Sequence, residues 1–321
     1  MGIRALRLSN TIRLPRHLPL RNSLFRNPSK SPLERLVFLL LLLASAVTVL
    51  TTLGIVGVLV WESVHFFWHV NVFDFLTGTK WNALIEPKSF GVLPLINGTL
   101  LIGVTSCAIA IPLGGGAALF LSEYVRGKKR VLLKSFLEVL AGIPSVVYGF
   151  FAVSFVTPFL SKFFPDIPFF NALSASIVVA IMVVPTIASI SQDAFEAVPQ
   201  HLRDAAYGLG ARKFQVASTI VFPAALSGFV ASVILAFSRA IGETMAVTLA
   251  AGAIPHMGFD LFAGVQTMTA YIVQVSLGDT PSGTIEYQSM FGVALLLMIM
   301  TLTTNLIAQF VVRRFQEGER R

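Results

Sequence analysis

The sequence contains few charged residues and a single cysteine. Charged side chains make up 12% of the 321 residues, about half of the ~25% that is usual in soluble domains. Hydrophobic residues account for 55%, and the mean hydropathy is +0.78. The lone Cys107 excludes an internal disulfide and a metal cage built from cysteines. This composition excludes an ordinary soluble domain and indicates an integral membrane protein.

Motifs of the common enzyme classes are also missing. The chain contains no G-x-x-x-x-G-K-[ST] phosphate loop, no H-E-x-x-H and no G-x-S-x-G. Among five scattered histidines, His65 and His69 have the i, i+4 spacing that suits a metal ion. They also lie near Trp61 and Trp68 in the sequence, so we favour an aromatic belt at the outer face of the membrane that the chain crosses. We therefore predict neither an enzyme nor a metal site.

Long apolar runs, in contrast, are abundant. A run of roughly 20 apolar residues is enough to cross ~30 Å of hydrocarbon as a helix, and six such windows occur. The sequence therefore predicts an all-α integral membrane protein with six transmembrane helices. The windows lie near residues 36–61, 92–121, 134–158, 172–191, 225–250 and 291–312.

The basic residues alternate between the segments that join these windows. Twenty of the 24 Lys and Arg residues lie in the two tails and in the loops 122–134 and 192–224, whereas only three lie in the other loops. By the positive-inside rule, both termini are cytoplasmic in a multi-pass protein of the cytoplasmic membrane. The net charge of +8 then reflects membrane topology and contact with lipid, and no nucleic-acid partner is expected.

The first 30 residues are Arg-rich and contain no acidic residue. This composition fits an organellar transit peptide or a cytoplasmic tail that touches anionic lipid, and we favour the tail. The chain then divides into a basic tail at 1–35, a first transmembrane helix with its outer loop at 36–91, a transmembrane domain at 92–313 that includes a cytoplasmic loop at 193–223, and a cytoplasmic tail at 314–321.

Two further segments have a readable pattern. In "GIPSVVYG", residues 142–149, small residues permit close helix approach and Pro144 removes a helix donor. We predict a kink and packing site there, with pore lining as the alternative.

The outer loop 251–290 lacks Lys and Arg, and a helical spacing of apolar residues predicts a short helix in it. A docking surface for an outside partner and plain connecting structure both fit this loop. The spaced residues are Val265, Met268, Tyr271, Ile272 and Val275.

The stretch "DAAYGLGARK", residues 204–213, lies in the cytoplasmic loop between two apolar windows. Leu202, Ala205, Ala206 and Leu209 share one helix face, which is too weakly apolar to anchor in lipid. Small side chains let a helix lie deep in a groove of another protein, whereas the alternative is a solubilised helical hairpin. Two glycines, Gly208 and Gly210, permit a sharp change of direction after the helix.

Two charges, Arg239 and Glu243, lie within the fifth apolar window. A charge at bilayer depth costs at least ~2.5–3.5 kcal/mol, so such residues usually have a function. The two are four residues apart and a self-neutralised pair is the structural alternative, although Arg before Glu is the poorer order for such a bridge. The planar guanidinium of Arg239 suits an oxyanion. We expect both residues on a translocation pathway, with Glu243 orienting the guanidinium.

These motifs resemble those of a known family. Asp204-Ala205-Ala206, with Gly210, Ile220 and Pro223 at the expected spacing, is similar to the coupling loop of ABC importer permeases, in which Glu usually stands at the Asp204 position. From about residue 90 onward the chain also resembles the C-type permease subunit of phosphate-specific ABC importers. That similarity is carried by "LFLSEY" (119–124), "LAGIPSVVYG" (140–149) and "SRAIGETMAVT" (238–248).

The resemblance implies the fold of a type I ABC importer permease and a set of partners. These are an A-type permease that forms a heterodimer, two cytoplasmic ATPase subunits that bind ATP and Mg, and an extracytoplasmic phosphate-binding protein. It implies that residues 204–206, Gly208 and Gly210 couple to the ATPase and that Arg239 and Glu243 act in transport. Glu138 matches a family position too, and a hydrogen-bonding cap is the alternative role for it. No cofactor is expected on this chain itself.

The expected function is ATP-driven import of inorganic phosphate across the cytoplasmic membrane. The chemistry of Arg239 indicates only an oxyanion, and sulfate, molybdate or tungstate remain alternatives because phosphate rests on the resemblance. A secondary transporter or channel is a less favoured class, since repeat symmetry between the halves and midplane ion ligands are not visible in the sequence.

Overall fold

The computed structural model describes residues 32–319, so the predicted basic tail lies almost entirely outside the described residues. Contacts within the chain divide it into two units, and the division falls between Gly57 and Val58. Helix α1 (Pro32–His69) begins in the first unit and ends in the second, as an uninterrupted apolar helix. The second unit contains every other helix and strand that the structure describes.

Three further long helices are α3 (Leu93–Leu119), α7 (Ala172–Glu196) and α14 (Ile285–Glu319). The described chain has four helices long and apolar enough to cross a membrane, or six if each of two bent pairs is one span. The remaining elements are α2 (Val72–Thr77), β1 (Trp81–Asn82), β2 (Ser89–Phe90), the π-helical turn η1 (Phe120–Tyr124), α4 (Lys128–Gly142), α5 (Ser145–Phe151), η2 (Ala152–Val156), α6 (Thr157–Leu160), α8 (Gln200–Gly208), α9 (Lys213–Gln215), η3 (Val216–Val221), α10 (Phe222–Ala224), α11 (Leu226–Ile241), α12 (Met245–Ala250) and α13 (Met268–Leu277).

The third predicted span is not one helix. Helix α4 ends at Gly142, and the segment that begins with α5 continues at an angle of 87°. The cause is Pro144: Ile143 before it is extended, at φ −66° and ψ 129°, because proline disfavours a helical neighbour on its N-terminal side. A Cβ on Gly149 would lie 2.9 Å from Cβ of Leu249, so close packing accompanies the kink. The predicted kink and packing site is confirmed.

The fifth predicted span, 225–250, is also broken. A bend of 72° separates the segment ending at Ala224 from α11, just after Pro223. A second break follows Ile241, where Gly242 caps α11, and α12 starts only at Met245. Glu243 therefore lies between two helices instead of within one, which changes what it can contact.

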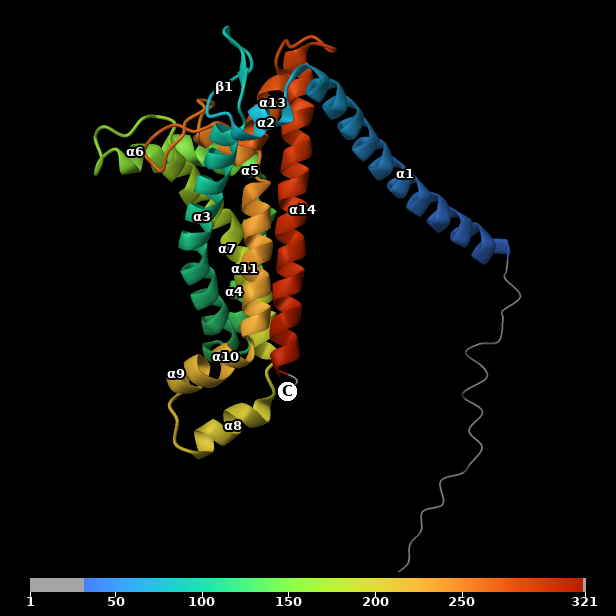
Figure 1. The fold of residues 1–321 in the computed structure, drawn as a ribbon. Coiled ribbons are helices and arrows are strands. Elements are labelled where there is room, and N and C mark those ends of the chain that lie inside the picture. Colours follow the sequence, from blue (N-terminus) through green and yellow to red (C-terminus); the bar gives the residue numbers. More distant parts are fainter. Residues whose placement is uncertain (1–31, 320–321) are drawn as a thin grey trace, which may run out of the picture. The chain divides into compact units, whose positions relative to one another are not determined.

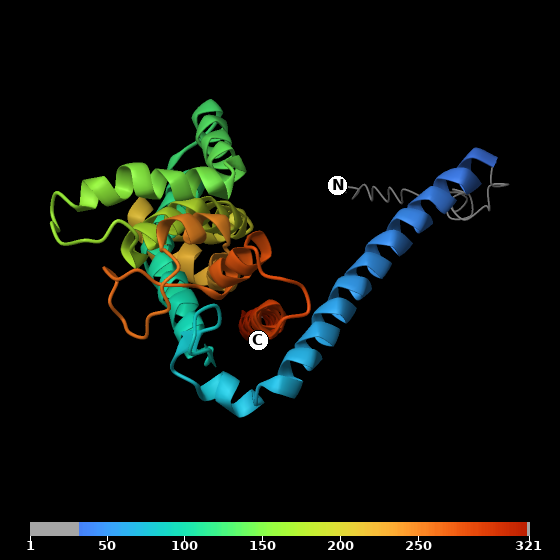
Figure 2. The ribbon, with the colours of Figure 1, turned by 90° about the horizontal axis from the view of Figure 1, so that it is seen from above.

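Helix α7 is the centre of the second unit. It packs against α3, α11, α4 and α12, and the side-by-side course of α3, α7, α11 and α14 is visible in Figure 1 and from above in Figure 2. Small residues allow these helices to approach closely. The fully buried residues of α7 are mostly Ala, Ser and Val, namely Ala172, Ser174, Ala175, Ser176, Val178, Val179, Ala180, Val183, Ala188 and Ser191.

One end of the bundle bears α8, α9 and α10, and the other bears the β1–β2 hairpin, α2 and α13 (Figure 1). The hairpin end has its own apolar cluster, which includes Phe66, Phe75, Trp81 and Tyr271. Helix α13 confirms the short helix predicted in the loop 251–290, although Val265 precedes its first turn. The hairpin is also tied to α14 by an ion pair between Lys88 and Glu286.

The packing of α3 on α7 yields a stability prediction. A Cβ at Gly114 would lie 2.8 Å from Cβ of Ile187, whereas a Cβ at Gly116 has nothing within 4 Å. We expect Gly114→Ala to lower the free energy of unfolding by ~1–3 kcal/mol through overpacking. Gly116→Ala controls for the gain in helix propensity. Thermal unfolding of the two variants in detergent measures the difference, and equal melting temperatures contradict the predicted contact.

Candidate functional site

Helix α8 carries the residues predicted to couple to a partner. Asp204 and Ala205 are exposed, and Leu209 directly after the helix is 90% exposed. Ala206 differs from the prediction because it is buried against this chain, so the predicted face is divided between the interior and the surface. The exposed part, at the end of the bundle, combines small and apolar groups with the carboxylate of Asp204.

The predicted change of direction occurs at Gly210 and not at Gly208. Gly208 is the last residue of α8 and has no positive φ, whereas Gly210 has a φ of +83°. The N–H groups of Gly210 and Ala211 bond to the carbonyls of Tyr207 and Ala206 at 2.9 and 3.1 Å. This is the Schellman arrangement, in which a left-handed glycine closes a helix, so Gly210 fixes the exit from α8.

Arg203 holds α8 against the bundle. Its Nε and Nη2 donate to Oε1 of Glu123 in η1 at 3.1 and 2.9 Å, and both side chains are buried. Nη2 also donates to the carbonyl of Phe195 at 2.7 Å and Nη1 to that of Val198. A guanidinium at the C-terminal turn of α7 is favourable for the helix dipole. One side chain therefore joins α8, η1 and the end of α7.

Sequence reasoning missed this pair. In the sequence, Arg203 was counted only as one basic residue of the cytoplasmic loop. Glu123 was noted only as part of the motif "LFLSEY". The two are 80 residues apart, so no spacing rule connects them. The available signal was an acid at the end of a long apolar window, which has to find a partner when it is buried.

Arg239 lies in the last turn of α11 and is exposed on this chain. Its Nη1 donates to Oγ1 of Thr186, near the middle of α7, at 3.2 Å. It forms no ion pair with Glu243, so the expected orientation of the guanidinium by Glu243 is wrong for this structure. The helix break at Gly242 removes the i, i+4 geometry on which that expectation rested.

Glu243 instead stabilises the start of α12. Its Oε1 accepts a hydrogen bond from the N–H of Ala246 at 3.1 Å. Its carbonyl accepts from Oγ1 of Thr269 in α13 at 2.8 Å. A carboxylate at a helix N-terminus satisfies a free N–H and complements the helix dipole. Glu243 thus has a structural partner of its own, four residues from the exposed Arg239.

Glu138 lies inside α4, so the hydrogen-bonding cap suggested for it is wrong. It lines a cavity of about 150 Å³ between α4 and α7. Thr186 belongs to the same lining, and it is also the residue to which Arg239 donates. Thr186 therefore contacts Arg239 and shares the cavity lining with Glu138, which is itself exposed on this chain. The polar residues of the lining are Lys134, Glu138, Thr186, Ser189 and Gln192.

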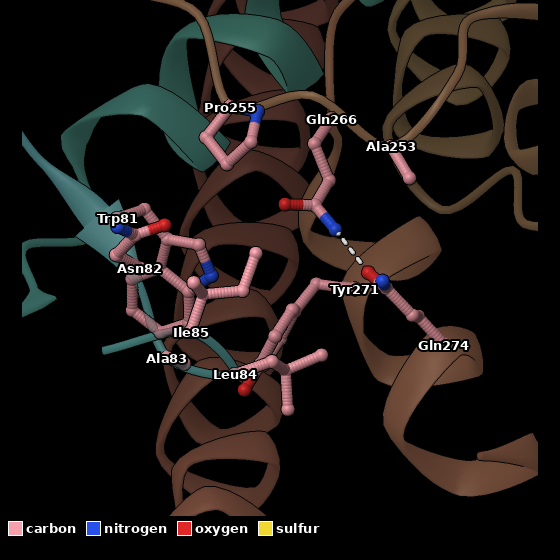
Figure 3. A pocket seen from close by; sticks show the side chains of 10 residues that line it. All are labelled: Trp81, Asn82, Ala83, Leu84, Ile85, Ala253, Pro255, Gln266, Tyr271 and Gln274. Carbon is pink, nitrogen blue, oxygen red and sulfur yellow. Dashed lines mark hydrogen bonds between the residues drawn. The ribbon is translucent and has the colours of Figure 1, made fainter. Parts of the chain in front are cut away.

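A second, smaller pocket of about 70 Å³ lies at the hairpin end of the bundle. Figure 3 shows Trp81, Tyr271 and Gln266 around it, and Nε2 of Gln266 donates to Oε1 of Gln274 at 2.6 Å. Its lining contains no charged side chain. Charged groups line the cavity beside α7 and also a larger pocket of about 540 Å³ at the hairpin end, which includes Lys80 and Lys88.

The histidine pair predicted as part of an aromatic belt lies in α1. The ring of His65 packs against Trp61 and Trp68 at centroid distances of 4.9 and 4.6 Å. Nδ1 of His65 and of His69 each contact a backbone carbonyl one turn earlier. Within residues 32–319, no group of three or more potential metal ligands is present.

Long apolar helices packed in a bundle, with a short exposed helix at one end, fit a multi-pass membrane protein. The chain matches the family model of the binding-protein-dependent transport system inner membrane component over residues 110–320. It belongs to this family and is a multi-pass protein of the inner membrane.

Similar sequences have been named as permeases. The chain is 33% identical to the phosphate transport system permease protein PstC of Mesorhizobium japonicum, over 84% of this chain and 88% of that protein. It is 34% identical to PstC 1 of Mycobacterium tuberculosis, over 76% and 83%. It is also 34% identical to the probable ABC transporter permease protein YqgH of Bacillus subtilis, over 76% and 79%.

Solved structures confirm the expected fold. A bacterial ABC transporter involved in alginate import aligns with a TM-score of 0.61 over 87% of this chain and 96% of the other, at 14% identity. The MetNI methionine ABC transporter in an inward-facing form aligns with a TM-score of 0.54 over 72% and 99%, at 18% identity. The chain has the fold of a type I ABC importer permease.

The Arg203–Glu123 pair yields a prediction about α8. Leaving one member of a buried pair uncompensated costs ~3–5 kcal/mol, so Glu123→Gln should loosen α8. We expect faster amide hydrogen exchange in residues 198–208 of the purified protein. Asp193→Asn, which removes an exposed partner 3.5 Å from Lys134, is the control because surface pairs contribute ~0–1 kcal/mol. Unchanged exchange in Glu123→Gln contradicts the anchoring role.

Proposed function

We propose that this chain is a membrane-spanning permease subunit of an ATP-driven importer that translocates inorganic phosphate. It is not itself the ATPase; α8 couples it to separate ATPase subunits at the cytoplasmic face. An A-type permease completes the membrane channel, and a phosphate-binding protein delivers the anion from outside. The names of the relatives support the substrate, and the basic loops support the cytoplasmic location of α8.

The observation that carries this proposal is the exposure of Arg239. An Arg that faces lipid at bilayer depth costs ~2.5–3.5 kcal/mol or more. This side chain is nevertheless exposed, and within the part of the chain that the structure describes its hydrogen-bond partner is Thr186 alone. Its exposed face must therefore meet water or protein in the assembly. A pathway between this chain and a second permease supplies both, and a guanidinium there attracts an oxyanion.

Helix α8 supplies the mechanical connection. Its small, exposed side chains fit a groove of the ATPase, and closure of the ATPase pair moves α8. Because Arg203 bonds both to Glu123 and to the end of α7, this movement reaches α3 and α7 directly. The helices then change between outward-facing and inward-facing arrangements. The anion passes Arg239 in the outward-facing arrangement and leaves on the cytoplasmic side.

The coupling role leads to a prediction for Ala205. We expect Ala205→Trp to place a bulky group on the exposed face of α8 and to lower phosphate uptake at least tenfold, with normal membrane insertion. Ala197→Trp is the matched control, since Ala197 is exposed just before α8 but outside it. Uptake and co-purification of the ATPase are measured together. Full uptake with Ala205→Trp excludes α8 as the coupling helix.

The substrate is tested by uptake of labelled phosphate in cells that lack this chain, with and without its restoration. We expect rescue that excess arsenate inhibits and that sulfate or molybdate leaves unchanged, because arsenate shares the shape and protonation of phosphate. Rescue inhibited by sulfate or molybdate assigns a different oxyanion. Failure of rescue for every oxyanion rejects an oxyanion as the substrate.

A further inference from the structure

Helix α4 lies beside α7, yet none of its own residues is buried. Apolar burial is the main source of stabilisation for a packed helix, and α4 has little of it. Its position against α7 therefore depends strongly on its polar contacts. The apolar side chains of α4 that are more than 60% exposed are Val131, Leu132, Phe136 and Val139.

Two ion pairs join α4 to the last turns of α7. Arg130 bonds Glu196, and Nζ of Lys134 lies 3.5 Å from Oδ1 of Asp193. The two bases are four residues apart on α4 and the two acids three apart on α7, so each set lies on one helix face. Nε2 of the buried Gln192 also donates to Oε1 of Glu196 at 2.7 Å. That carboxylate is therefore attached to the core as well as to α4.

The other end of α4 has the features of a hinge. A bend of 87° at Ile143 and Pro144 separates α4 from the segment that begins with α5. A Cβ on Gly142 would meet nothing within 4 Å, so the last residue of α4 has free space around it. A side-chain hydrogen bond crosses the bend, from the hydroxyl of the buried Tyr148 to the carbonyl of Leu140 at 2.8 Å. Helix α4 can therefore turn about this point while α5 stays packed.

The acids of the two ion pairs belong to the part of α7 that α8 also contacts. Phe195 lies between Asp193 and Glu196 in the chain. Its carbonyl accepts a hydrogen bond from Nη2 of Arg203 in α8 at 2.7 Å. A displacement of α8 therefore reaches both acids through one turn of backbone. Ion pairs this open to solvent contribute little individually, so such a displacement can separate them.

We propose that Arg130, Lys134, Asp193 and Glu196 form a latch that holds α4 on α7 and opens once in each transport cycle. In the closed form, α4 lies over a cavity of about 150 Å³ that Ser189 of α7 helps to line. When the ATPase moves α8, the last turn of α7 shifts, the two pairs separate, and α4 turns away from α7. The four residues position α4 and do not bind the anion. This inference rests on the proposed coupling through α8 and deepens it by naming the helix that moves in response.

The first test measures how well α4 covers α7. Ser189→Cys places a thiol on the covered side of α7, and the one native cysteine, Cys107, is buried. Its rate of reaction with a water-soluble maleimide is measured in the purified importer with all its subunits. We expect the double change Arg130→Gln and Lys134→Gln to raise this rate at least threefold, because both ion pairs are lost.

The matched control removes the same charge from the same helix. Lys128 and Lys129 are exposed on α4 and form no ion pair within the described residues. The double change Lys128→Gln and Lys129→Gln should leave the reaction rate of Ser189→Cys unchanged. Equal rates in the two double variants reject the latch.

The second test prevents the opening. Lys134→Cys and Asp193→Cys together place two thiols where one ion pair stands, and a bifunctional methanethiosulfonate reagent bridges them through disulfides that dithiothreitol cleaves. We expect the bridge to lower ATP-dependent phosphate uptake into proteoliposomes at least tenfold, and reduction to restore uptake. Recovery on reduction is not what misfolding produces. Each single cysteine variant, treated with the same reagent, is the control because no bridge can form in it.

The two tests separate failure of the latch from failure of the proposed function. Full uptake with the bridge in place, verified by mass spectrometry, overturns the latch and leaves the importer. An unmodified importer that moves no phosphate overturns the proposed substrate. The maleimide reaction requires no transported anion, so it still decides whether the ion pairs hold α4 over α7.

Discussion

The buried ion pair between Arg203 and Glu123 is the interaction on which the end of the bundle depends. Of the nine residues of α8, only Arg203 and Ala206 are buried, so apolar packing alone holds this helix weakly. The guanidinium adds bonds to η1 and to the last turn of α7. The Nζ of Lys213, at the start of α9, lies 5.0 Å from the ring centre of Tyr124, which is the last residue of η1. Both arms of the loop therefore meet at η1.

Helix α7 joins this anchor to Thr186, the residue to which Arg239 donates. Phe195, which accepts from Arg203, lies one turn after Gln192, and Thr186 lies less than two further turns back. A continuous helix moves as a unit, so a displacement of α8 changes the cavity and the contact with Arg239 together. Pro185 sits at this point and removes one backbone donor from the helix. The backbone hydrogen bonding of α7 is thus weakest at Pro185, next to Thr186.

Hydropathy was sufficient to predict the membrane class, the approximate spans and α13, because burial in lipid demands long apolar runs. Hydropathy alone shows neither the break at Ile143 nor the one at Gly242, since both windows stay apolar across them. Pro144 predicted the first break, whereas the break at Gly242 was missed. Glu243 was misplaced for that reason: its i, i+4 spacing from Arg239 has meaning only within a helix. Contacts across distant segments, such as Arg203 with Glu123 or Thr186 with Arg239, depend on tertiary packing that no local pattern encodes.

Exposed residues on this chain differ in what they require from their surroundings. Phe150, Phe155 and Leu302 are more than half exposed, and lipid tails satisfy such side chains at no cost. Arg239 is exposed as well, but lipid is the one environment that it disfavours strongly. The position of Arg239 on α11 therefore indicates which face of the bundle points toward water or a second subunit. In the proposed importer, that face lines the pathway, and the phenylalanine-rich face of α5 and η2 needs no polar partner.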